Sequence, residues 1–582
     1  MSIPWKSVGG YERTPIGNYA RFPYLVGGTG IGISGGGTGI TGPTGQVGPT
    51  GSSGGPIGPT GPSGPAFITN SNMDATFFPV FVGGTGNQPL LADVTPTATS
   101  INPSNGNFNV VNTMRLTQTQ VAVGKNAGLT TQGTNAVAIG NQAGNATQGT
   151  SAVAIGQNAG NNNQGVQSVA IGLNAGAGGT TGQGANSVAV GFSAGSNNQG
   201  ANSVAIGVSA GQTAQSANAV AIGVNAGITT QGESAVAIGN GAGNRNQETA
   251  TIAIGLNAGF DRQRTNAVAI GQSAGYTNQG ANSIAIGQNA GLGSGATGQG
   301  QSAIAIGNSA GEISQGAQSV AIGPNAGNGS QEGGCVAIGT GAGQTTQRRT
   351  AVAIGQSAGA TNQGAESVAI GISAGTGFQG GGSVAIGARA GNGSQENSCV
   401  AIGVDAGNIT QRTNAIAIGN SAGNNNQQAG AVAIGVGAGN ITQRTNAVAI
   451  GNGAGNNNQQ AGAVAIGVSA GNNVQESGAV AIGTNAGQTQ GSGAVAIGGN
   501  AGQGTVSRQG ANSIAIGNNA GTGSQIAGSI CLNASGLPLN PGAAGFFVNP
   551  IRVGVAGSSF TPPLPPGVLY FEPTTNEILR TS

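Results

Sequence analysis

The chain has 582 residues, of which 118 are glycine, only 5% are charged and none is histidine. Globular enzymes carry roughly one quarter charged residues, so this composition indicates a repetitive structural protein. The net charge is +2 without a basic block, and no apolar stretch reaches the length of a membrane span, so we expect neither nucleic acid binding nor membrane insertion.

Residues 1–41 combine aromatic side chains with a glycine-rich tail. The aromatic residues are Trp5, Tyr11, Tyr19, Phe22 and Tyr24. Because aromatic residues dominate binding energetics, this segment is a candidate anchor that docks into a particle or surface protein. A sticky, disordered end is an equal alternative. The segment lacks the apolar core of a secretory signal.

Residues 42–65 place glycine at every third position, with one phase slip, and proline commonly follows the glycine. This is the sequence pattern of collagen, in which only glycine fits at the axis of three chains. We therefore interpret the segment as a short collagen-like stalk, which favours a homotrimer. A flexible stalk without a triple helix is the alternative.

Residues 66–120 hold short apolar runs, such as 77–82 and Leu90-Leu91, separated by turn sequences. Such runs predict short strands. Because the ends of a solenoid must be shielded, we interpret this segment as a small β cap over the first coil of the repeat that follows.

Residues 121–530 repeat a sixteen-residue unit, V-A-I-G-x-x-A-G-x-x-x-Q-x-x-x-S/A, in twenty-five copies, and a degenerate copy begins at Ile530. A short, regular period predicts a solenoid. Val and Ile favour strands, the glycines allow tight turns, and two glycines per unit disfavour a helix. We predict a parallel β-solenoid with two short strands and two turns per coil. Twenty-five steps of about 4.8 Å make a rod of roughly 120 Å.

The columns of this unit predict which side chains face inwards. We expect the Val137 and Ile139 columns to form the dry interior, and the Gln148 column to form a ladder of amide hydrogen bonds. The constant alanine of the Ala138 column would then face outwards. It is either an exposed small residue or, as we prefer, a flat seam that another chain approaches closely, because one coil buries little apolar area.

Three Glu–Arg pairs with a sequence separation of sixteen support the stacking register, because each pair would lie on neighbouring coils. They are Glu248 and Arg264, Glu332 and Arg348, and Glu396 and Arg412.

Four units depart from sixteen residues. The longer units start at Val169, Ile284 and Val495, and the shorter one starts at Val480. All four change length between the second glycine and the glutamine, so this turn is a candidate ligand face.

Cys335 and Cys399 occupy one column four coils apart, about 19 Å by the coil spacing, too far for a disulfide. Both are expected to be buried free thiols.

Residues 531–582 leave the repeat and form a C-terminal cap or tip. Residues 569–578 predict a hairpin. The pieces F-V-N-P-I-R and L-Y-F-x-x-x-T-N-E-I resemble what precedes the self-cleaving chaperone domain of phage tail spikes and viral fibres.

The repeat resembles the head repeat of trimeric autotransporter adhesins, N-S-V-A-I-G-x-x-S. Residues 187–191 and 202–207 match it closely. The resemblance implies a trimeric β-roll, although the unit here is longer. Long runs of this kind also resemble fibre proteins of tailed phages and giant viruses.

We expect no enzyme activity, and no catalytic, cofactor-binding or metal-binding residues. Glu233 and Glu248 could approach each other on neighbouring coils, but solvated turn residues are the simpler interpretation. The calcium repeat of secreted β-rolls needs an Asp in each unit, whereas the rod has only Asp261 and Asp405.

The preferred hypothesis is a homotrimeric structural fibre on a virion surface that binds a host glycan or protein. A bacterial surface or spore-coat adhesin filament is the alternative, and a polysaccharide-degrading tail spike is third.

Overall fold

The computed structural model describes residues 119–179, 181–294, 298–504, 508–551, 566–567, 569–575 and 577–580, and the backbone of four strands between residues 80 and 109. The chain divides into two compact units, Met1–Arg115 and Leu116–Ser582. The proposed anchor at 1–41 and collagen-like stalk at 42–65 lie outside the described residues.

The first unit contains two antiparallel strand pairs. Strand β1 (Val80–Val82) pairs with β2 (Leu90–Ala92), and β3 (Ser100–Asn102) pairs with β4 (Asn107–Asn109). The prediction of short strands within residues 66–120 is confirmed. The role of these strands as a cap over the first coil stays a prediction.

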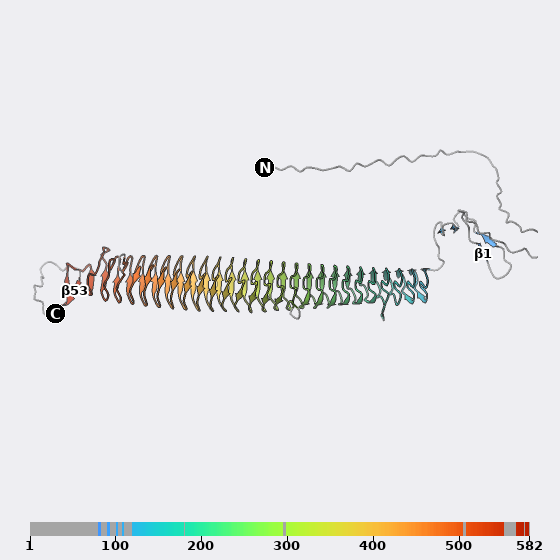
Figure 1. Cartoon of the computed structure of the whole chain (residues 1–582), viewed down its shortest axis with the longest axis horizontal. Coiled ribbons are helices and arrows are strands. Elements are labelled where there is room, and N and C mark those ends of the chain that lie inside the picture. The colour runs from blue at the N-terminus through green and yellow to red at the C-terminus, as the bar shows by residue number, and fades with distance from the viewer. Residues whose placement is uncertain are drawn as a thin grey trace, which may run out of the picture. The chain divides into compact units, whose positions relative to one another are not determined.

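The second unit contains a parallel β-solenoid, and no helix occurs among its described residues (Figure 1). The first three residues of every sixteen-residue copy form a strand, from β5 (Val121–Val123) to β49 (Ile514–Ile516). Each strand pairs in parallel with its equivalent in the next coil, as β34 (Val384–Ile386) does with β36 (Val400–Ile402). The predicted period and fold class are therefore confirmed, with about 26 coils when the copy at Ile530 is included.

Strands of two or three residues that end at the repeat glutamine form a second face of the solenoid. They begin with β6 (Thr131–Gln132) and β8 (Thr147–Gln148). A six-stranded sheet runs from β12 (Asn197–Gln199) to β22 (Thr277–Gln279), and a twelve-stranded sheet from β25 (Ser314–Gln315) to β47 (Thr489–Gln490). The longer coils interrupt these sheets. At such coils an isolated β-bridge, and not a strand, joins glutamines such as Gln183 and Gln299 to the glutamine of a neighbouring coil. Length changes are thus absorbed in the predicted turn.

The interior of each coil is built from alanine and glutamine, not from valine and isoleucine. Ala138, Ala143 and Gln148 are 0%, 0% and 1% exposed, and the equivalent residues are buried in nearly every coil. Val137 is half-buried at the surface and Ile139 is 37% exposed. The predicted inner and outer faces of the strand were therefore exchanged: side chains alternate with period two as expected, but the small residue faces inwards.

The reason for this exchange is the narrow cross-section of a coil. A methyl group placed on Gly391 would lie 3.3 Å from the Cβ of Ala385 and 2.9 Å from Oε1 of Gln395. The interior at Ala385 therefore has no space for the branched side chain of Val or Ile. Gly387 closes the turn after the strand with a φ of +126°, and a Cβ there would lie 2.7 Å from the carbonyl oxygen of Gly403.

The glutamine column forms the predicted ladder inside the rod. The Nε2 atom of Gln395 donates to Val384 O at 3.0 Å within its own coil and to Oε1 of Gln411 at 2.8 Å in the next. The same amide-to-amide bond links each glutamine to the next from Gln379 to Gln525 without a break. From Gln395 to Gln525 each buried amide oxygen thereby finds a donor where no water can reach it.

The C-terminal residues close the solenoid. Strand β50 (Ile530–Asn533) continues the parallel sheet to β51 (Phe546–Asn549), and β53 (Glu577–Arg580) then pairs antiparallel with β51 and with β52 (Leu569–Glu572). Leu539 and Phe547 are buried against the last alanines of the interior. Larger side chains thus shield the end of the core, and the predicted hairpin is confirmed.

Candidate interaction face

The outward side of the long parallel sheet is a continuous apolar surface, which we call the Val-Ile face. It consists of the side chains of the first and third residues of every coil from Val121 to Ile516. Neighbours in the same column, one coil above and one below, cover each side chain in part and leave it half-buried or exposed. Ile206 and Ile516 illustrate this, with 38% and 40% of their surface exposed.

A third column of exposed apolar residues lies in the turn after the strand in part of the rod. In nine coils the fifth residue of the unit is apolar and 40–59% exposed. These residues are Leu173, Phe192, Val208, Val224, Leu256, Ile372, Val404, Val436 and Val468.

Charged side chains are segregated from this face. Among the fifth positions, only Lys125 is charged, and no first or third position carries a charge. The other charges of the rod lie on turns and on the glutamine side, such as Arg389 and Asp405, which form an ion pair at 2.6 Å. A long sheet face free of charge differs from an ordinary solvated sheet surface, where polar residues alternate outwards.

The size of the Val-Ile face exceeds what isolated proteins usually expose. About fifty Val and Ile side chains with roughly 50 Å² exposed each give on the order of 2,500 Å², whereas the largest apolar patch of a typical monomer is about 300–600 Å². A standard stable interface buries about 800 Å² per partner. The face is therefore large enough for more than one neighbouring chain.

The Ala138 column, predicted to be the seam with another chain, lies in the interior and contacts no outside surface. That prediction was wrong for the same steric reason as the exchange of the strand faces. The surface available to another chain on this sheet is the Val-Ile face.

The charged pairs lie on neighbouring coils as predicted, but their carboxylates bind turn groups and not the arginines. Oε2 of Glu248 accepts from N and Oγ1 of Thr265, each at 2.9 Å. Glu396 binds Thr413 in the same way, which lowers the pKa of that carboxyl. Glu233 is exposed one coil away, and no described interaction joins it to Glu248.

The described cysteines are unreactive in their surroundings. Cys335, Cys399 and Cys531 are free and buried, as predicted for the first two. Burial raises the pKa of Cys399 and of Cys531 to about 11, so few of these thiols ionise near neutral pH. Within the residues that the structure describes, no group of three or more Cys, Asp or Glu side chains could hold a metal ion, and no helix is long and apolar enough to cross a membrane.

Sequence reasoning missed the Val-Ile face although two signals were present. Charges avoid the first, third and, except for Lys125, the fifth position of the unit, and the fifth position is often apolar. An apolar run at alternate positions that extends into the turn points to a surface contact more than to the interior of a thin coil.

No protein-family model, curated protein or solved structure matches this chain.

Proposed function

We propose that this chain is a structural fibre protein of a virion surface, in which three parallel copies associate through their Val-Ile faces and hold host-binding surfaces away from the particle. The observation that carries the proposal is the uncharged Val-Ile face along the whole rod.

The repeat spacing favours a second copy of the same chain as the partner. Twenty-five coils place identical apolar side chains at steps of about 4.8 Å, and a partner with a different spacing would lose register within a few coils. Another copy has the same spacing and the same uncharged face. Burial of the face would then add hydrophobic stabilisation that the alanine interior supplies only weakly.

The Gly-X-Y sequence of residues 42–65 is the basis for proposing three chains that run in the same direction. A Gly-X-Y sequence is stable only in three chains that run in the same direction. Three parallel rods around one axis would bring their Val-Ile faces together, as in the trimeric β-roll that the repeat resembles. Residues 1–41 would anchor this assembly to the particle, and multivalent display would strengthen weak host contacts.

Analytical ultracentrifugation of the intact chain tests the assembly. We expect a trimer, and we expect the variant Ile386→Thr, Ile402→Thr, Ile418→Thr to dissociate at a higher protein concentration than wild type because it makes the face more polar on three adjacent coils. The control variant changes exposed apolar residues on the opposite side of the rod, Ile409→Thr and Ile441→Thr, and should remain trimeric. A monomeric wild-type chain, or equal dissociation of both variants, would overturn the proposed interface.

Immunogold labelling with an antibody against the rod tests the location. Label on intact virions supports a fibre, and its loss from particles made with a chain lacking residues 1–41 supports the anchor. Label confined to bacterial cells or spores would instead favour the adhesin filament.

A further inference from the structure

The coils between Val188 and Gln279 differ from the rest of the rod on their glutamine side. Their strands have three residues, as in β16 (Thr229–Gln231), β18 (Arg245–Gln247) and β20 (Asp261–Gln263), whereas later strands have two. Only the first and third residues pair with the neighbouring strands, and the middle residue bulges outwards. Its φ is positive, +49° at Thr230 and +58° at Arg262. A β-branched residue in this conformation is strained, and such strain is concentrated at functional sites.

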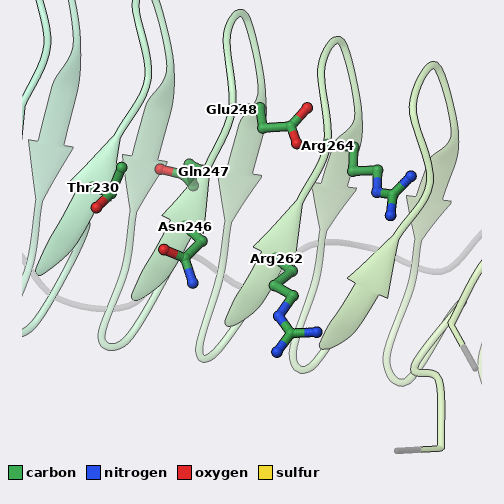
Figure 2. Close-up of a pocket in the computed structure, with 6 residues that line it drawn as sticks. All are labelled: Thr230, Asn246, Gln247, Glu248, Arg262 and Arg264. Atoms are coloured by element: carbon green, nitrogen blue, oxygen red, sulfur yellow. The ribbon is translucent and has the colours of Figure 1, made fainter. Parts of the chain in front are cut away.

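A groove of about 350 Å³ lies along these bulges (Figure 2). It is lined by Thr230, Asn246, Gln247, Glu248, Arg262 and Arg264, which come from three successive coils. The groove is shallow, and all six lining residues have polar or charged side chains, although their stems contribute more of its exposed surface than their polar ends. This shape suits an extended polar chain more than a compact apolar ligand.

Two guanidinium groups of the groove have hydrogen-bond donors to spare. Among the described residues, Arg264 makes no ion pair or side-chain hydrogen bond, and Arg262 makes one long contact, from Nη1 to Oδ1 of Asn278 at 3.5 Å. The nearby carboxylate of Glu248 is engaged by Thr265 through Oε2. The other oxygen of Glu248, Oε1, has no described partner, so the lining combines two largely unpaired guanidinium groups with one carboxylate.

The groove lies near a cluster of aromatic and cationic side chains, which are rare in the rod. Residues 121–525 contain four aromatic residues, and two of them, Phe260 and Tyr276, stack at 4.9 Å between ring centroids. The guanidinium of Arg245 lies 5.7 Å from the Phe260 ring. The two rings come directly before β20 and β22, the strands that carry Arg262 and its contact Asn278.

We propose that this groove binds an acidic glycan, with the carboxylate or sulfate groups of the sugar on Arg262 and Arg264. The planar guanidinium matches pairs of anionic oxygens and stays charged at every physiological pH. The amide of Asn246 and the hydroxyl of Thr230 would bind sugar hydroxyls between the acidic groups. This inference rests on the proposed role in host attachment and identifies the class of ligand.

The test measures binding of the full-length protein to immobilised glycans by biolayer interferometry. The probes are a heparin fragment as the sulfated chain, polysialic acid as the carboxylated chain and dextran as the neutral chain. We expect the protein to bind a sulfated or a carboxylated probe, with an affinity that falls as salt increases, and to ignore dextran.

The variant for this test is Arg262→Asn with Arg264→Gln. Asparagine already occupies the position of Arg262 in the preceding and following coils, at Asn246 and Asn278, and glutamine occupies the position of Arg264 at Gln428, so the fold is expected to hold. Losing two charge-assisted contacts should weaken binding by about tenfold or more. The charge-matched control is Arg412→Gln with Arg444→Gln, both at the same coil position as Arg264 but outside the groove, and its binding should be unchanged.

Equal weakening by the control would show that scattered positive charge binds the glycan, and would overturn the site. Absence of binding to both acidic probes, or equal binding to dextran, would also overturn it. None of these results bears on the proposed fibre, which is tested by the oligomeric state and by labelling of particles. Preference for the sulfated or the carboxylated probe identifies the source of the anionic group.

Discussion

The buried glutamine ladder predicts different effects of the same substitution at two residues that share their burial and their position in the coil. Gln363 and Gln395 are 1% and 0% exposed. Gln395 donates to Oε1 of Gln411 at 2.8 Å, whereas Gln363 donates only to the backbone, and Oε1 of Gln379 in the next coil has no partner. Replacement by leucine, of similar size, should therefore have different consequences at the two sites.

The magnitude follows from the acceptor that each substitution leaves unpaired. Gln395→Leu orphans the buried Oε1 of Gln411, which costs about 1–3 kcal/mol in addition to the lost bond to Val384 O. Gln363→Leu loses its bonds to Val352 O and Ser367 O and the incoming bond from Nε2 of Gln347, as Gln395→Leu loses the one from Gln379. It leaves no amide oxygen newly unpaired, because Oε1 of Gln379 already has no partner. The difference between the variants should be about 1–3 kcal/mol, or roughly 5- to 150-fold in the local opening constant.

Native-state hydrogen exchange with mass spectrometry measures this opening coil by coil, which suits a rod whose coils contact only their neighbours. Peptides around Gln395 should lose much more protection in Gln395→Leu than peptides around Gln363 lose in Gln363→Leu. Equal losses at both sites, or a larger loss at Gln363, would refute the idea that the amide ladder stabilises the rod beyond its backbone bonds.

Three further predictions concern the core and the ionisable groups. Ala385→Val should lower the free energy of unfolding by about 1–3 kcal/mol because the interior has no room for two more methyl groups, as measured by loss of exchange protection in that coil. Cys399 and Cys531, whose pKa is raised to about 11, should resist iodoacetamide at pH 8 until the chain is unfolded, as read by mass spectrometry. Arg389 lowers the pKa of Asp405, so this pair stabilises the fold above the ordinary Asp pKa near 4 and the contribution is lost as the pH falls through the folded value. Melting curves of Arg389→Gln should accordingly match wild type below that window and differ slightly above it.

The sequence predicted the coil, its strands and its register because these follow from period alone. A repeat of sixteen residues places Val384 beside Val400 whatever the interior contains, and the ladder from Gln379 to Gln525 needs only that each glutamine meets its equivalent in the next coil. Turn positions were predicted for a similar reason, since Gly387 has a φ that other residues rarely adopt.

The faces of the strand could not be assigned by hydrophobicity, because the deciding quantity is the width of the coil. Val, Ala and Ile are all apolar, and alternation separates Ala138 from Val137 and Ile139 without saying which side is inside. The width depends on how the turns around Gly140 and Gly144 set the distance between the two strands of one coil, which is a three-dimensional property. The groove at Arg262 and Arg264 was missed because Arg262 adopts a left-handed conformation that its residue type does not suggest.

Because Ala faces inwards and Val and Ile face outwards, the interior of a single rod contributes little hydrophobic stabilisation. Inside each coil, two alanines, one further small residue at the last position of the unit and one glutamine amide replace a conventional hydrophobic core, and the larger apolar side chains remain outside. Hydrophobic stabilisation scales with the apolar area removed from water, so a coil has more to gain from covering Val and Ile than from its own interior. In the proposed trimer the backbone and glutamine bonds would define the shape of each chain, and association would supply most of its hydrophobic stabilisation. Folding and assembly of the rod would then be coupled, and its apparent stability should rise with protein concentration.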